Sequence, residues 1–284
     1  MLRLLRLRLQ HWNRCIRYPY HPMPISTFWN QVRLLTPGLE PLITLGHGTR
    51  LDRAILWPVD WTDDWGPAAV LPGSVRSVET PPLSMVRQQL PYRVVAYTAS
   101  GLQSTAVLAM EAATPTTDGP PDLRIWAATI EVLAGLGCRR LWLLGDGWLV
   151  GSASEPGDFA TIVDHLNWSK ENILVGYPAE ADTPSRFIDT QRLYHPVMGV
   201  PRVIALYAQP PAMQTPAELA LAARLGATAV TGDVVPLALL GHFKGMAVTA
   251  LLRTRGRVMG RGLELTIGDP ALLAGVLAPT APPP

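Results

Sequence analysis

The sequence predicts a single α/β domain in which helices flank a mixed, mainly parallel, twisted sheet. Short apolar runs of strand length alternate along the chain with stretches whose apolar residues have helical spacing, as in strands joined by crossover helices. The chain has 284 residues, of which 48 % are hydrophobic and 16 % charged, and this composition supports one large core. No internal repeat is found.

Strands are predicted where an apolar run, often rich in β-branched residues, ends at a glycine or a polar turn. In chain order these runs are residues 41–46, 54–57, 92–98, 140–144, 159–165, 201–207, 227–230 and 246–252. Apart from the second run, residues 51–90 carry many prolines and tryptophans, and we expect this region to be irregular.

Helices are predicted at residues 123–136, after Thr215, at 237–243 and at 270–277. The second of these has the clearest boundaries. Thr215 suits the N-cap, Pro216 the first turn, and Glu218 completes a capping box. Gly226 suits the C-terminal end. A narrow face that would let this helix lie close to a sheet is formed by Leu219, Ala222, Ala223 and Gly226.

The charge distribution separates the termini from the body. Residues 1–22 contain five arginines and no acidic residue, and removing those five charges from the net charge of +2 leaves −3. We expect residues 1–22 to be a basic, disordered extension, residues 23–278 the domain, and residues 279–284 a proline-rich tail. A targeting presequence, a membrane-surface segment and an upstream sequence before a start at Met23 remain open for the extension.

Several classes of partner and site are disfavoured by the composition. The mildly acidic body argues against nucleic-acid binding, and no apolar run reaches the roughly 18 residues needed to cross a membrane. Two distant cysteines give no disulfide framework, which favours a reducing, cytoplasmic location. No His-x-x-x-His or Cys-x-x-Cys spacing indicates a metal site.

Polar residues follow three of the predicted strands. His47 follows the 41–46 run, Asp146 the 140–144 run and Asp233 the 227–230 run. Because ligands bind beyond the carboxyl ends of strands in open α/β sheets, we expect all three at one sheet edge. A carboxylate with a histidine could orient a water for hydrolysis, although each residue alone also suits a structural turn.

The segment 210–236 resembles the trimeric purine nucleoside phosphorylase and methylthioadenosine phosphorylase family. It reads PPAMQTPAE, then a helix, then LGATAVTGDVVP, in the frame of that family's GPSFETPAE and LGADAVGMSTVPE. Further similar motifs follow the family's order along residues 38–255. They are Leu45-Gly46-His47-Gly48, Asp164-His165-Leu166-Asn167, Glu171 to Gly176 and Ser185 to Asp189.

The resemblance implies phosphorolysis of a purine nucleoside in a homotrimer, with phosphate as co-substrate and no cofactor. It implies phosphate-binding backbone groups at the Gly-rich turn 46–49, which consists of Gly46, His47, Gly48 and Thr49. It implies substrate binding by Met213, Gln214 and Gly232, and a catalytic position at Arg255. Asp146 and Asp233 are predicted catalytic residues through their placement after strands, together with His47. Arg255 would donate to a base nitrogen, unless residues 253–257 form a solvated basic turn.

The chain departs from the family at several chemical positions. Ser100-Gly101-Leu102 stands where the family has Arg-Phe-His, and Asp233 stands at its phosphate-binding Ser. Gln214 replaces a Glu, and Met213 a Phe. A divergent phosphorylase with a weakened phosphate site, a water-using nucleosidase and a non-catalytic nucleoside-binding or structural homologue therefore all remain open.

Overall fold

The structure is a computed structural model that describes most of the chain outside its termini and several loops. The described residues are 25–46, 51–57, 67–71, 75–80, 84–85, 88–89, 92–98, 105–112, 123–150, 159–169, 172–178, 188–208, 214–232, 234–259, 262–263 and 270–277. The predicted extension 1–22 and tail 279–284 lie outside these residues. No helix in the described part is long and apolar enough to cross a membrane.

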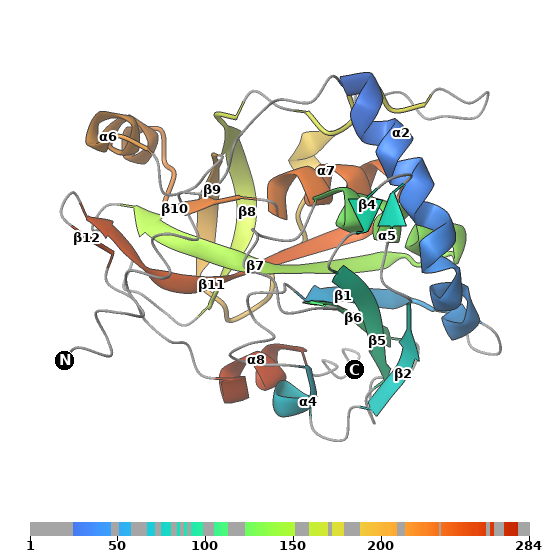
Figure 1. Cartoon of the computed structure of the whole chain (residues 1–284). Coiled ribbons are helices and arrows are strands. Elements are labelled where there is room, and N and C mark those ends of the chain that lie inside the picture. Colours follow the sequence, from blue (N-terminus) through green and yellow to red (C-terminus); the bar gives the residue numbers. More distant parts are fainter. Residues whose placement is uncertain are drawn as a thin grey trace, which may run out of the picture.

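Helices and strands alternate along the chain, as predicted (Figure 1). The α-helices are α2 (Ile25–Leu35), α4 (Pro67–Val70), α5 (Leu123–Gly135), α6 (Pro216–Arg224), α7 (Val234–Phe243) and α8 (Pro270–Leu277). Two 3-10 helices are η1 (Thr36–Gly46) and η2 (Thr190–Arg192). The strands are β1 (Arg53–Trp57), β2 (Val75–Glu79), β3 (Ser84–Met85), β4 (Gln88–Gln89), β5 (Tyr92–Thr98), β6 (Thr105–Ala112), β7 (Arg140–Val150), β8 (Phe159–Asn167), β9 (Arg202–Tyr207), β10 (Ala229–Thr231), β11 (Ala247–Met259) and β12 (Gly262–Leu263).

The main sheet is mixed and has the strand order β12-β11-β8-β9-β10-β7-β1-β6-β5-β2. An additional parallel pairing joins β11 to β7, so β7, β11, β8, β9 and β10 form a closed ring. One edge of β7 pairs with β1 over Arg140–Leu143 and then with β10 over Gly147–Leu149. The long strand β7 therefore belongs to both the open sheet and the ring.

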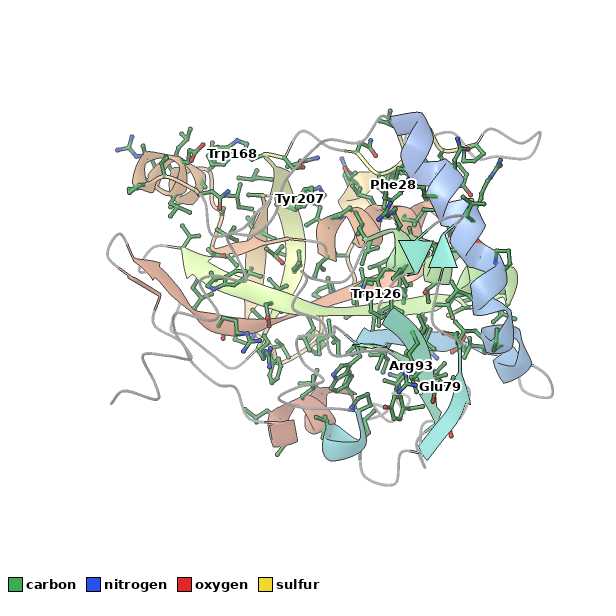
Figure 2. The ribbon with its side chains drawn as sticks, viewed as in Figure 1. Phe28, Glu79, Arg93, Trp126, Trp168 and Tyr207 are labelled. Atoms are coloured by element: carbon green, nitrogen blue, oxygen red, sulfur yellow. The ribbon has the colours of Figure 1, made fainter. Side chains whose placement is uncertain are left out.

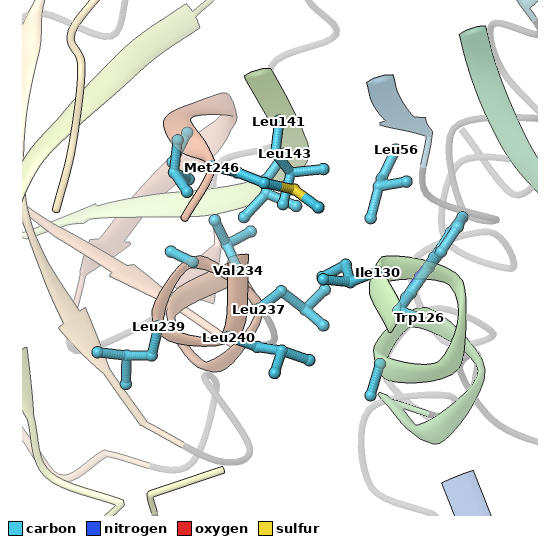
Figure 3. Close-up of a cluster of buried hydrophobic side chains, with 14 of the residues drawn as sticks. Leu56, Trp126, Ile130, Leu141, Leu143, Val234, Leu237, Leu239, Leu240 and Met246 are labelled. Carbon is cyan, nitrogen blue, oxygen red and sulfur yellow. The ribbon is translucent and has the colours of Figure 1, made fainter. Parts of the chain in front are cut away.

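Helices cover both faces of the sheet. The larger core lies between the strands and α2, α5 and α7, and a smaller core lies on the other face against α4 and α8. Figure 3 shows Leu237 of α7 next to Ile130 of α5, in the same buried cluster as Leu141 and Leu143 of β7. At roughly 25 cal/mol per Å² of apolar surface, these layers supply most of the favourable free energy of folding.

Most of the predicted elements are confirmed, and the clearest exception lies near the N-terminus. Residues 41–46 were predicted to be a strand but belong to η1, because Leu35, Leu39 and Leu42 are fully buried at helical spacing. Helix α2 and strand β6 were not predicted. Strands β7 and β11 are longer than predicted, and both extensions carry residues of the candidate site.

Candidate functional site

Four strands of the ring meet where β9 and β10 end. Thr231, the last residue of β10, pairs with Tyr207 of β9 on one side and with Gly147 of β7 on the other. In β7, the residue before Gly147 is Asp146, which pairs with Arg253 of β11. This junction therefore gathers the charged residues of β7 and β11 beside the ends of two parallel strands.

Asp146 accepts hydrogen bonds from two arginines of β11. Arg253 donates from Nε to Oδ1 at 2.9 Å and from Nη2 to Oδ2 at 3.5 Å, and Arg255 donates from Nε to Oδ2 at 2.9 Å. The Arg253 residue is 0 % exposed, Arg255 is 8 % exposed, and the Asp146 side chain keeps 16 % of its surface accessible. The three side chains form a nearly desolvated ion cluster, the Asp146 cluster.

A β-bulge in β11 brings the second arginine into this cluster. The pairing of β11 with β7 shifts between Thr254 and Arg257, and Gly256 within the bulge has a φ of +129°. Bulges add a residue to one strand and redirect its side chains, and a positive φ of this size suits glycine. The alternative of a solvated basic turn at 253–257 is therefore wrong, because these residues continue a strand and Arg253 and Arg255 are buried.

The two arginines control the protonation of the carboxylate. Burial alone would raise the pKa of Asp146, but the charges and hydrogen bonds of Arg253 and Arg255 outweigh it and hold that pKa below its usual range. A carboxylate with a lowered pKa binds a proton weakly and makes a weak general base. Asp146 is thus better suited to holding cations in place than to activating water.

The backbone at Asp146 is fixed from both sides. A Cβ on Gly145 would lie 2.2 Å from Cγ2 of Val234 in α7, and a Cβ on Gly147 would lie 2.8 Å from Cδ1 of Leu252. The two glycines thus let β7 pass close to α7 and β11. The hydroxyl of Thr231 also donates to the Asp146 carbonyl oxygen at 2.9 Å. These contacts leave the carboxylate little freedom to move away from the arginines.

The capped helix α6 follows β9 in the chain. Thr215 is its N-cap, with the predicted capping box to Glu218, and Pro216 occupies the first turn. Gln214 immediately precedes the cap and is half-buried. The chain leaves β9 at Ala208, whose N–H donates to the Thr231 carbonyl oxygen at 3.2 Å. Gln214 thus follows one strand end and Gly232 the neighbouring one.

Helix α6 is held on this side of the ring by a small apolar cluster. Ala222 of α6 packs with residues of β7, β9 and β10, and Leu219 and Trp168 lie against the same cluster. The backbone N–H of Trp168 also donates to the Tyr207 carbonyl oxygen at 3.0 Å. Figure 2 labels both residues on the side of the sheet that carries α6. Ala223, predicted on the packed face, is exposed.

Comparisons with known proteins agree with this geometry. The purine nucleoside phosphorylase 1 of Bacillus subtilis (strain 168) is 27 % identical over 135 residues, which cover 43 % of this chain and 49 % of that protein. The protein of the same name from Geobacillus stearothermophilus is 29 % identical over 135 residues, with the same coverage. The match thus spans about half the length of these curated relatives. No protein-family model matches the chain.

The likeness in fold extends over most of the chain. A crystal structure of Schistosoma mansoni purine nucleoside phosphorylase with a monocyclic inhibitor has a TM-score of 0.61 and 17 % identity, and covers 88 % of this chain and 94 % of its own. The complex of that protein with adenosine has a TM-score of 0.60 and 17 % identity, and covers 87 % and 91 %. The chain therefore has the fold of the purine nucleoside phosphorylases and is similar in sequence to two of them over 135 residues.

The predicted site is only partly within the described residues. Asp146, Arg255 and Gly232 lie at or next to the junction of β7, β9, β10 and β11, whereas Gln214 is placed by its position before α6. Gly46 ends η1 instead of a strand, so the predicted strand that was to place His47 at the same sheet edge does not form. The role of Gly46 in phosphate binding stays a prediction. Five further predicted site residues lie outside the described residues: His47, Gly48, Thr49, Met213 and Asp233.

Arg253 is the site residue that the sequence did not single out. The signal was present, because Leu251, Arg253 and Arg255 alternate with period two and continue the face of the predicted strand. Two arginines in succession on one strand face suggested solvent instead of burial. Among the described residues, no group of three or more His, Cys, Asp or Glu side chains could hold a metal ion.

Proposed function

We propose that the protein binds a purine-type nucleoside at the junction of β7, β9, β10 and β11 and cleaves its N-glycosidic bond. The observation that carries the proposal is the placement of Gly232 directly after the end of β10, beside the Asp146 cluster. Gln214 follows the neighbouring strand β9 in the chain. Ligand sites in α/β proteins form beyond such ends. The half-buried amide of Gln214 supplies one donor and one acceptor, which suits the edge of a purine.

The group that takes the sugar from the purine, phosphate or water, is the part of this chemistry that the described residues support least. Phosphate carries negative charge and needs nearby cations or N–H donors. In this chain, the two buried arginines of the junction are already engaged by Asp146. We therefore expect a weak phosphate site, with water as the competing acceptor.

The experiment is base release from a panel of purine nucleosides, with phosphate or with chloride at equal ionic strength. Chromatography of the free base should show turnover of at least one nucleoside, with little dependence on phosphate. Gln214→Ala should lower kcat/KM by about 10- to 100-fold, as expected when one positioned hydrogen-bonding group is lost. Gln191→Ala, at an exposed glutamine of η2, is the matched control and should leave turnover unchanged.

One observation favours a second candidate, a nucleoside-binding protein without turnover. Asp146 is held by Arg253 and Arg255 with a lowered pKa, so the described junction contains no strong base. Thermal unfolding distinguishes the candidates, because this homologue would be stabilised by nucleosides without releasing base. Neither stabilisation nor turnover with any nucleoside would contradict both.

Assembly as a homotrimer in the cytoplasm belongs to the same proposal and rests on the family resemblance. Exposed apolar side chains, including Leu221 and Leu225 of α6, provide surface for association. Size-exclusion chromatography with light scattering should give three times the chain mass of 30.9 kDa. A monomer at micromolar concentration would contradict the assembly without bearing on the ligand.

A further inference from the structure

The Asp146 carboxylate lies where a bound oxyanion would lie between two guanidinium groups. Arg253 and Arg255 approach it with Nε groups that donate to different oxygens, both at 2.9 Å. Guanidinium groups bind carboxylates and phosphates in this way, through several N–H donors in a fixed plane. The geometry is that of an anion site whose anion is part of the chain.

The arginines need a counter-anion in the folded state. Arg253 is fully buried and Arg255 nearly so. A buried charge without a partner is strongly destabilising, whereas a paired and hydrogen-bonded one is tolerated. Both arginines form ion pairs with the carboxylate of Asp146. If that carboxylate were removed, the same two cations would favour any small oxyanion that could reach them.

The strand holds this carboxylate at a high effective concentration. Thr231 fixes the Asp146 carbonyl oxygen, and the close passage of Gly145 and Gly147 fixes the backbone on either side. A tethered group with matched geometry reaches effective concentrations of about millimolar or above, so a free anion must compete against it. The 16 % exposure of the Asp146 side chain shows that solvent reaches the position.

We propose that Asp146 is a built-in counter-anion that occupies an oxyanion site formed by Arg253 and Arg255 and keeps inorganic phosphate out of it. This inference deepens the proposed function and shares its site, because it says which co-substrate the junction excludes. Removal of the carboxylate uncovers a site for small oxyanions. Phosphate and formate, a free equivalent of the missing carboxylate, are the two anions to test.

The experiment measures thermal unfolding of the full chain with added phosphate or formate, against chloride at equal ionic strength, without nucleoside. Wild type should be unaffected by either anion. Asp146→Ala should be stabilised in a saturable way, by about 5 °C when the anion is a hundredfold above its Kd. Asp146→Ala/Arg255→Met should lose that gain. Asp52→Ala, which frees the exposed Arg140 from its ion pair, is the matched control and should gain nothing.

Each result bears on the proposal without reference to catalysis. Stabilisation of Asp146→Ala by phosphate would confirm the inference. Stabilisation by formate alone would overturn it, because Asp146 would then not be the group that excludes phosphate. Saturable phosphate binding by wild type, or a folded Asp146→Ala that responds to neither anion, would overturn the inference. If Asp146→Ala is unfolded, folding restored by phosphate supports it, and failure of phosphate to restore folding contradicts it.

Discussion

The path of β7 beneath α7 gives a prediction that depends on one short contact. In Gly145→Ala, the new Cβ would lie 2.2 Å from Cγ2 of Val234, whereas ordinary contacts begin near 3.4 Å. Val234 is β-branched, buried and the first residue of α7, so it cannot rotate away freely. Overpacking of this kind costs about 1–3 kcal/mol, and we expect a loss of about 2 kcal/mol in unfolding free energy.

A double-mutant cycle with Val234→Ala tests the cause of this loss. Removing the Val234 methyl groups costs stability by itself but also relieves the clash, so the double variant should be about 1 kcal/mol more stable than the sum of the single changes predicts. Gly147→Ala is the matched control, because its Cβ would meet the mobile end of Leu252 at 2.8 Å and should cost less.

Urea unfolding followed by circular dichroism measures wild type, the two single variants, the double variant and the Gly147→Ala control. The midpoints convert to free energies of unfolding at a common slope. The reasoning is refuted if Gly145→Ala is as stable as wild type, or if its effect simply adds to that of Val234→Ala. Either result would mean that α7 does not lie against β7 as described, and that the backbone of Asp146 is less constrained than the cluster requires.

Three further outcomes are expected. The pKa of Asp146 is held below its usual range, so its ion pairs stabilise the fold at neutral pH and are lost as the pH falls through the lowered pKa. Urea midpoints of wild type and Asp146→Asn should therefore differ at pH 7 and converge below about pH 4. Arg255→Met should lower the free energy of unfolding by about 2 kcal/mol, because a buried partner of Asp146 is lost. Arg140→Met removes an exposed ion pair and should lower it by less than about 1 kcal/mol. Thr215→Ala should cost about 1 kcal/mol through loss of the N-cap, and equal stability of Thr215→Ala and Thr215→Ser would contradict the capping role.

Elements whose signals are local were predictable from the sequence. The helix after Thr215 is an example, because its cap, first-turn proline and terminal glycine lie within twelve residues and act through neighbouring backbone groups. The prediction of a strand at residues 41–46 failed for the opposite reason. Their apolar run suits a strand or a helix equally, and the tertiary core, which buries Leu35, Leu39 and Leu42 together with residues of α5, favours the helix.

The Asp146 cluster shows why the position of a site can be predicted when its chemistry cannot. The carboxylate was predicted to follow a strand at 140–144, but β7 continues to Val150, so Asp146 lies within the strand and beside the end of β10. Its partners depend on the register between β7 and β11, which are more than 100 residues apart in sequence, and on the bulge at Gly256. No local pattern encodes that register.

This dependence also explains why the basic run 253–257 was ambiguous. Arginines with no partner in view are best explained by solvation, since burying a lone guanidinium is prohibitively costly. Once Asp146 is paired opposite Arg253, the same residues become a strand with a neutralised interior charge, and Arg255 follows through the bulge. The burial of the two arginines and the presence of Asp146 at this junction therefore depend on each other. Removal of Asp146 would take away a counter-anion that the two arginines share.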